Sequence, residues 1–157
     1  MKVNLGCGSE ILEGWVNVDV RALPDVDAVC DLKDLSRFQD KSWDACRMSH
    51  VIEHFTEAEA VTILSQIFCK LKKGGKLEVY CPDAWKIAYD YVQKMITLTE
   101  FSRLLFGNQA YPEELHKMAL DRARLVKLIE HAGFKIISHN PRPNAYPYDL
   151  GIQAVKP

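Results

Sequence analysis

The chain has 157 residues, of which 48% are hydrophobic and 26% charged, and its formal net charge is -1. These values lie near the averages of globular proteins, so they exclude a disordered or fibrous chain, and the near-neutral charge argues against general nucleic-acid binding. A chain of this length fits one domain with one sizeable core, and we expect residues 1–157 to form it.

The first third of the chain predicts short strands separated by turns. Apolar residues either run up to Gly6 or alternate with polar ones, as a half-buried strand requires. The strands expected here are Lys2–Leu5, Trp15–Val20, Asp27–Asp31 and Ser42–Met48. Only six residues separate Gly8 from Trp15, whereas a parallel crossover ordinarily needs a dozen or more. We therefore expect a shortened first crossover, with one helical turn or none.

From Thr56 onward the pattern takes a helical period. Thr56 and Glu59 match a capping box, apolar residues recur at helical spacing, and Gly74-Gly75 supplies the end of the helix. Further helices are expected at Ala84–Ile96, Thr99–Phe106 and Arg122–Ala132, and further strands at Lys76–Cys81, Phe134–His139 and Leu150–Val155. Strands alternating with helices predict an α/β fold with a Rossmann-like, mostly parallel sheet, and the strand–loop–strand ending predicts an antiparallel last strand.

The five cysteines are odd in number and lack the C-x-x-C spacing of a zinc ribbon, so we expect reduced, buried thiols. The first residues lack a basic-then-apolar leader, and no apolar run approaches the ~18 residues that span a bilayer. We therefore expect a cytoplasmic protein with no membrane partner.

Residue types that suit a nucleoside ligand follow successive strands. Gly6-x-Gly8 is a tight turn after the first strand, and Asp19 ends the second, where a carboxylate can accept ribose hydroxyls. Asp31-Leu32 follows the third strand, where an acid beside an apolar side chain suits an adenine ring. Each feature alone also fits a plain turn, a loop acid or a helix cap. Their order along one edge of a parallel sheet, where α/β folds bind ligands, favours a binding site.

With two further segments, these pieces resemble the class I S-adenosylmethionine-dependent methyltransferases, and among them small members with an N-L-G-C-G…G-W-x-N-V-D opening. The matching segments are Asn4-Leu5-Gly6-Cys7-Gly8, Gly14-Trp15-Val16-Asn17-Val18-Asp19, Cys30-Asp31-Leu32, Ser49-His50-Val51-Ile52-Glu53-His54 and Leu71-Lys72-Lys73-Gly74-Gly75. The resemblance implies S-adenosylmethionine as the cofactor. The residues it implies are Gly6, Cys7 and Gly8 for the methionine part, Asp19 for the ribose, Asp31 and Leu32 for the adenine, and Ser49 and His50 near the sulfonium. Val20, which follows Asp19, is also expected to contact the cofactor.

The chain departs from the wider superfamily in two ways that bear on the site. Asn4 stands where an Asp is frequent, so the usual acidic partner of the ligand's amino group is lost or supplied elsewhere. The chain also begins at its first strand, without the helices that cover the sheet in larger relatives. One sheet face is therefore expected to be thinly covered, and a homodimer or the 84–107 segment would bury it.

The segment His50-Val51-Ile52-Glu53-His54 matches H-x-x-E-H, a zinc motif of metalloproteases in which two histidines four residues apart hold the metal and the glutamate is the base. The segment begins at a strand end rather than inside a long helix. The favoured interpretation is that Glu53 and His54 begin the loop and helix that cover the cofactor, and no metal is expected.

The acceptor is expected to be a small molecule or a saccharide, bound by the region 84–116. His116, in the loop before the last long helix, is the candidate catalytic base for a hydroxyl acceptor. Aromatic residues of this region would line the acceptor pocket or form core; they are Trp85, Tyr89, Tyr91, Phe101, Phe106 and Tyr111. Arg142 is a candidate contact for an anionic acceptor.

Two other functions compete with a methyltransferase. A non-catalytic S-adenosylmethionine-binding module of the same fold would account for the missing helices. A dinucleotide oxidoreductase is disfavoured, because Ile11 breaks the G-x-G-x-x-G pattern and because a pyrophosphate needs a helix N-terminus, which we do not expect after Gly8.

Overall fold

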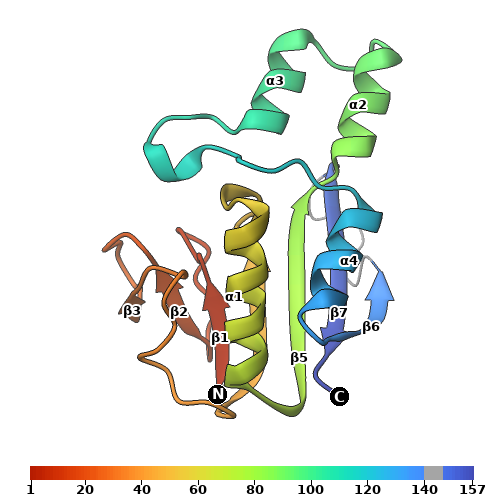
Figure 1. Ribbon diagram of the computed structural model, residues 1–157. Helices are drawn as coiled ribbons and strands as arrows, with labels where there is room; N and C mark the ends of the chain where they lie inside the picture. The colour runs from red at the N-terminus through yellow and green to blue at the C-terminus, as the bar shows by residue number, and fades with distance from the viewer. Residues whose placement is uncertain (140–146) are drawn as a thin grey trace.

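The structure is a computed structural model that describes residues 1–139 and 147–157. Seven strands form one sheet in the order β3-β2-β1-β4-β5-β7-β6, parallel except for β7, which runs antiparallel to both β5 and β6 (Figure 1). The strands are β1 (Lys2–Leu5), β2 (Val16–Asp19), β3 (Ala28–Val29), β4 (Trp43–Ser49), β5 (Leu71–Pro82), β6 (Lys135–His139) and β7 (Asp149–Val155). The expected α/β class, its mostly parallel sheet and its antiparallel last strand are confirmed.

The helices are few and unevenly placed along the chain. They are η1 (Ile52–His54), α1 (Glu57–Lys70), α2 (Ala84–Val92), α3 (Leu98–Phe106), η2 (Pro112–Glu114) and α4 (Arg122–His131). Residues 6–15, all described, contain no helix, so the first crossover is as short as expected. In the described part of the chain, none of the helices has the length and apolar character that a membrane span requires.

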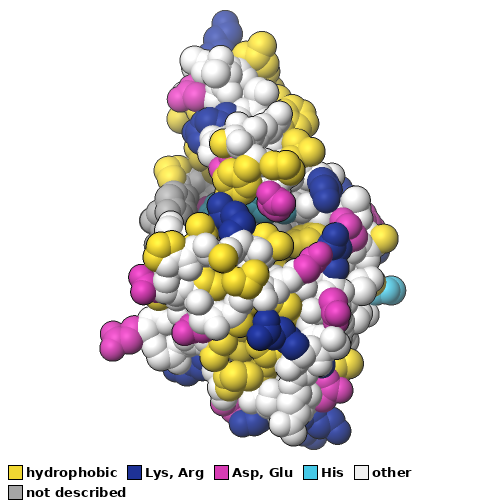
Figure 2. All heavy atoms as spheres, turned by 90° about the vertical axis from the view of Figure 1, so that its left-hand side faces the viewer, with side chains coloured by type: hydrophobic (Ala, Val, Ile, Leu, Met, Phe, Trp, Pro, Cys, Tyr) yellow, Lys and Arg dark blue, Asp and Glu magenta, His cyan; other side chains and the backbone are white. Residues whose placement is uncertain are grey.

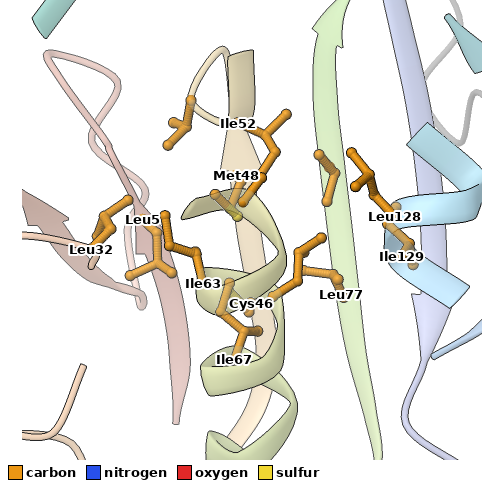
Figure 3. Packing of buried hydrophobic residues seen from close by; sticks show 14 of the residues in the cluster. Leu5, Leu32, Cys46, Met48, Ile52, Ile63, Ile67, Leu77, Leu128 and Ile129 are labelled. Atoms are coloured by element: carbon orange, nitrogen blue, oxygen red, sulfur yellow. The ribbon is translucent and has the colours of Figure 1, made fainter. Parts of the chain in front are cut away.

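One sheet face packs on α1 and α4 and forms the core. Leu5 on β1, Met48 on β4 and Leu77 on β5 point toward Ile63 of α1, and the α4 side chains extend the same cluster (Figure 3). All of these side chains are fully buried or nearly so. Because side chains alternate along a strand, the neighbours of Leu5, Met48 and Leu77 on each strand face the other side of the sheet.

The opposite face of the sheet is polar. Asn4 donates to Asn17 Oδ1 at 3.1 Å, Arg47 donates to Asn4 Oδ1 at 3.3 Å and to Glu10 at 2.8 Å, and Gln153 donates to Glu78 at 2.9 Å. On this thinly covered face, the polar side chains hydrogen-bond to one another, so the face needs no apolar partner. The 84–107 segment does not close this face, because α2 and α3 stand beyond the carboxyl ends of the parallel strands (Figure 1).

Several element boundaries differ from those expected: α2 ends at Val92 instead of Ile96, β5 already begins at Leu71, and the end of α1 and the third strand also differ. Helix α1 ends at Lys70, four residues before Gly74, because Leu71 already pairs with Trp43 as part of β5. The third strand has two residues instead of five, pairing only Ala28 and Val29 with β2.

Helices α2 and α3 form a small layer of their own. Tyr91 and Phe101 contact each other with ring centroids 4.6 Å apart and hold the two helices together. A capping box of Thr97 and Glu100 starts α3, yet none of the nine α3 residues, all described, is buried. The two helices stand beyond the edge of the sheet where the parallel strands end (Figure 1).

Candidate functional site

The turn after β1 is held in a shape that requires glycine. Gly6 and Gly8 have φ angles of 64° and 52°, in the left-handed region where a side chain is strained. A Cβ on Gly6 would lie 2.4 Å from Cγ2 of Val51. The Gly8 N–H donates to Asp19 Oδ2 at 2.8 Å, and the Cys7 N–H donates to the Val18 carbonyl at 3.0 Å. The turn is thus fastened to the end of β2.

Asp19 is almost fully occupied by protein donors. Its side chain is 7% exposed, and its Oδ1 accepts from the Arg21 main-chain N–H at 2.9 Å and from Arg21 Nε at 3.1 Å. Oδ2 accepts the Gly8 N–H. A carboxylate offers about four lone-pair sites, so Oδ2 alone retains capacity for one more donor. The Arg21 guanidinium also lies 4.6 Å from the ring centroid of Tyr111, which links β2 to the loop before η2.

Two adjoining cavities lie along the carboxyl edge of the sheet, one of about 260 Å³ and one of about 890 Å³. Gly6, Arg21 and His50 line both of them. Figure 2 shows the molecule hollowed between the upper helical part and the sheet domain, with acidic and basic side chains around the hollow.

Every predicted cofactor residue, and the candidate base His116, lines one of these two cavities. The smaller cavity is lined by Gly6, Asp19, Val20, Asp31, Leu32 and His50. The larger cavity is lined by Gly6, Cys7, Gly8, Ser49, His50 and His116. The nucleoside-type residues thus surround one cavity, and the glycine turn and His116 surround the other.

His50 is held between two carboxylates. Its Nε2 lies 3.0 Å from Asp149 Oδ1, and its Nδ1 lies 3.5 Å from Glu53 Oε1. Burial lowers the pKa of His50, but Asp149 and Glu53 outweigh it and raise that pKa to about 10. His50 also has a left-handed backbone with φ of 54°. It is therefore an imidazolium at the junction of the two cavities.

His116 reaches the site because its loop is anchored to η1. The main-chain N–H groups of Lys117 and Met118 donate to the Glu53 carbonyl at 2.8 and 3.2 Å. The His116 ring then packs edge-on against His54 with centroids 4.9 Å apart. Burial lowers the pKa of His116, so this ring is neutral near pH 7.

Several residues of the site were not predicted. Glu10, Arg21 and Asp149 line the larger cavity, and their signal in the sequence was weak, since an arginine two residues after Asp19 is an ordinary loop residue. Of the six aromatic residues considered, all within the described part of the chain, only Tyr111 lines either cavity. Trp85 and Tyr89 instead stack on each other and are exposed. Arg142 lies outside the described residues.

Comparison with known proteins finds a family model that matches part of the chain. Residues 7–79 match a family model described as a methyltransferase domain. This stretch runs from the glycine turn to the middle of β5 and contains every predicted cofactor residue except Gly6. No curated protein matches the sequence as a relative.

Solved structures share the whole fold at low sequence identity. A Pyrococcus horikoshii protein is 18% identical with a TM-score of 0.71, covering 99% of this chain and 81% of its own. A SAM-dependent methyltransferase from Methanosarcina mazei is 18% identical with a TM-score of 0.68, covering 99% and 91%. A Burkholderia thailandensis 1,6-didemethyltoxoflavin N1-methyltransferase, solved with its substrate and S-adenosylhomocysteine, is 16% identical with a TM-score of 0.65, covering 99% and 70%.

Proposed function

We propose that this chain is a class I S-adenosylmethionine-dependent methyltransferase that methylates a small molecule or a saccharide bound in the larger cavity. The observation that carries the proposal is the junction of the two cavities at Gly6 and His50. A cofactor that spans this junction presents its methyl group to the larger cavity.

We assign the cofactor's parts from the residue types around each cavity. The adenine lies in the smaller cavity beside Leu32 and Val51, with Asp31 toward its amino group. The ribose lies against Asp19, where Oδ2 accepts one hydroxyl. The methionine part follows the turn Gly6–Gly8 into the larger cavity.

The cofactor's ammonium group needs an acid other than Asn4. The Asn4 side chain is 1% exposed and is fully engaged with Asn17, Glu10 and Arg47 on the polar sheet face. Glu10 lines the larger cavity just beyond the glycine turn, and its carboxylate is fixed by Arg47 at 2.8 Å. We assign Glu10 the role that an acid at position 4 has in other members.

Methyl transfer asks little covalent chemistry of the protein. The acceptor attacks the methyl carbon in line while the carbon–sulfur bond breaks, so the main contribution is alignment and exclusion of water. A hydroxyl acceptor must also lose its proton, and His116 is neutral and faces the larger cavity. A general base of this kind contributes roughly 10²–10⁴-fold.

The cavity walls favour a polar acceptor of small size. Around its acceptor end stand charged and polar side chains of both signs, namely Arg103, Asn108, Glu114, Tyr148 and Asp149. Its volume of about 890 Å³ is within the roughly 300–1,000 Å³ typical of small-molecule sites, and the methionine part occupies some of it. A small molecule or a sugar unit fits the remainder.

Calorimetry with S-adenosylmethionine and S-adenosylhomocysteine tests the cofactor assignment. Asp19→Ala is expected to weaken both ligands about ten-fold or more, since roughly 1.4 kcal/mol corresponds to ten-fold and a charge-assisted hydrogen bond contributes at least that. Glu13→Ala, which removes an exposed acid of the same crossover, is the matched control and is expected to leave both affinities unchanged. Undetectable binding of both ligands to the wild type at millimolar concentration would overturn the proposal.

A screen for transfer of a radiolabelled methyl group then identifies the acceptor class. Polar metabolites and saccharides are incubated with the enzyme, and the products are identified by mass spectrometry. His116→Gln is expected to abolish most transfer to hydroxyl acceptors while S-adenosylmethionine affinity is retained. Transfer only to a protein or a nucleic acid would contradict the acceptor proposed here.

A further inference from the structure

Three potential ligand side chains converge beside the larger cavity: His54 and His116 line it, and Glu53 is buried next to them. Glu53 and His54 come from η1, and His116 comes from the loop before α4. One ligand atom of each lies within 4.8 Å of the other two. A divalent ion bound at about 2.1 Å in tetrahedral geometry holds its ligands roughly 3.4 Å apart, so side-chain rotations that close the group by about 1 Å complete such a site.

The Glu53 carboxylate is the least satisfied buried group of this cluster. The residue is 2% exposed, and neither of its oxygens accepts a hydrogen bond from the described residues. The nearest positive charge is His50 Nδ1, 3.5 Å from Oε1. A buried carboxylate with unfilled acceptor sites is costly, and a cation supplies what the described residues do not.

His54 is oriented as a metal ligand is. Its Nδ1 lies 3.3 Å from the Leu115 carbonyl, which leaves the other ring nitrogen free to face a metal. Ligating histidines usually donate their second ring N–H to a carbonyl or carboxylate, which fixes the tautomer and turns the other nitrogen toward the metal. A neutral imidazole is also the form that binds a metal.

We propose that Glu53, His54 and His116 form a binding site for one divalent transition-metal ion, with Zn²⁺ as the best-fitting ion. Two imidazoles and one carboxylate suit Zn²⁺ better than Mg²⁺, which prefers oxygen ligands and octahedral geometry. The ligand set differs from the H-x-x-E-H reading of the sequence. Glu53 is a ligand here and not a base, and His50 lies behind it, between Glu53 and Asp149.

The ion would act on the acceptor, and this consequence rests on the proposed function. His54 and His116 line the larger cavity, so the ion's open position faces the bound acceptor. A hydroxyl that coordinates the ion releases its proton to water more readily, and the resulting alkoxide attacks the methyl carbon while the sulfur keeps the electron pair of the broken bond. In the metal-loaded enzyme His116 is then a ligand, and the acceptor proton leaves through the metal.

The test measures metal binding by the full chain without cofactor or acceptor. ZnCl₂ titrated by calorimetry is expected to show one ion per chain. An excess of about 100 times the dissociation constant is expected to raise Tm by roughly 5–10 °C, whereas MgCl₂ does not. CoCl₂ is expected to give the absorption of nitrogen and oxygen ligands without a thiolate band, which excludes the cysteines as ligands.

Variants locate the ion. Glu53→Gln, His54→Asn and His116→Asn are each expected to lower Zn²⁺ affinity at least ten-fold, with loss of the Tm shift. His131→Asn and His139→Asn, at exposed histidines outside the cluster, serve as matched controls and should bind as the wild type does. Circular dichroism and S-adenosylmethionine affinity establish that each variant is folded. If Glu53→Gln fails to fold, His116→Asn tests the site instead, because His116 lies in a loop.

Either of two results would overturn the proposal: Zn²⁺ affinity that persists in the three ligand variants, or no binding to the wild type. Because S-adenosylmethionine binding is measured separately, the metal site and the proposed function fail independently. Chelation then tests the catalytic consequence. Transfer to a hydroxyl acceptor is expected to fall at least ten-fold with EDTA and to return with ZnCl₂, while full activity in EDTA would leave His116 as a simple base.

Discussion

Replacing Gly6 by alanine probes the contact that fixes the turn after β1. In this residue the φ angle is 64°, and an added Cβ would lie 2.4 Å from Cγ2 and 3.0 Å from Cγ1 of Val51. Both distances are well inside van der Waals contact, so Val51 or the turn has to move. Since Gly6 and Val51 also line the smaller cavity, the movement reaches the cofactor site.

The cost has two parts of similar size. A Cβ in the left-handed region costs roughly 1–2 kcal/mol, and overpacking a filled site costs about 1–3 kcal/mol. The lower entropy of the unfolded alanine chain returns about 0.4–1 kcal/mol. Gly6→Ala is therefore expected to lower the free energy of unfolding by roughly 3 kcal/mol, with weaker S-adenosylmethionine binding.

Gly14→Ala separates strain from crowding. Gly14 has a φ of 75° but nothing within 4 Å of an added Cβ, so only the strain part remains, about 1 kcal/mol. Urea unfolding of Gly6→Ala, of Val51→Ala and of the double variant gives a double-mutant cycle for the contact between these two residues. The double variant is expected to be more stable than the sum of its parts by about 1–3 kcal/mol, because Val51→Ala vacates the space. If the effects of Gly6→Ala and Val51→Ala on the free energy of unfolding simply added, the contact with Val51 would not be the reason that position 6 requires glycine.

Two further predictions concern the sheet and the thiols. Arg47→Ala is expected to destabilise the fold by about 2–3 kcal/mol in urea unfolding, because it strips Asn4 Oδ1 of its donor on the buried part of the polar face. Lys76→Ala, on the same face but exposed, should cost less than about 0.5 kcal/mol, and equal effects would argue against the network. In thiol titration at pH 8, Cys69 should react first, since the other four cysteines are buried and burial together with Asp19 raises the pKa of Cys7 to about 11. Rapid reaction of several thiols in the folded protein would contradict this.

The sequence permitted prediction of the sheet edge because that edge depends on local patterns. Each predicted cofactor residue lies at or just after the end of a strand. Because parallel strands end on the same side, residues such as Gly6, Asp19 and Asp31 come together in space. The short first crossover could be predicted from the number of residues between Gly8 and Trp15. These features need no knowledge of long-range packing.

Contacts across long sequence distances were not predictable. The His54–His116 pair depends on a loop anchored to η1 over more than sixty residues, and no local pattern encodes it. The end of α1 was misjudged for a similar reason. Leu71 has the spacing of a helical residue, but its pairing with Trp43 draws it into β5. Tertiary pairing there overrides the helical period.

The polar face explains how the glycine turn after β1 stays fixed although the first crossover contains no helix. On this face Asn4, Asn17 and Arg47 are joined by hydrogen bonds. The Asn17 Oδ1 also accepts the Leu12 N–H at 2.9 Å, and Arg47 donates to the Glu10 carboxylate. The network therefore binds two points of the loop 9–15, which contains no helix. The loop is thereby tied to the sheet at the point where a helix would otherwise hold it. Asparagine at position 4 then has a structural reason, because it is part of this hydrogen-bonded network. Under the proposed function, Glu10 of the same loop is the acid that faces the cofactor's ammonium group.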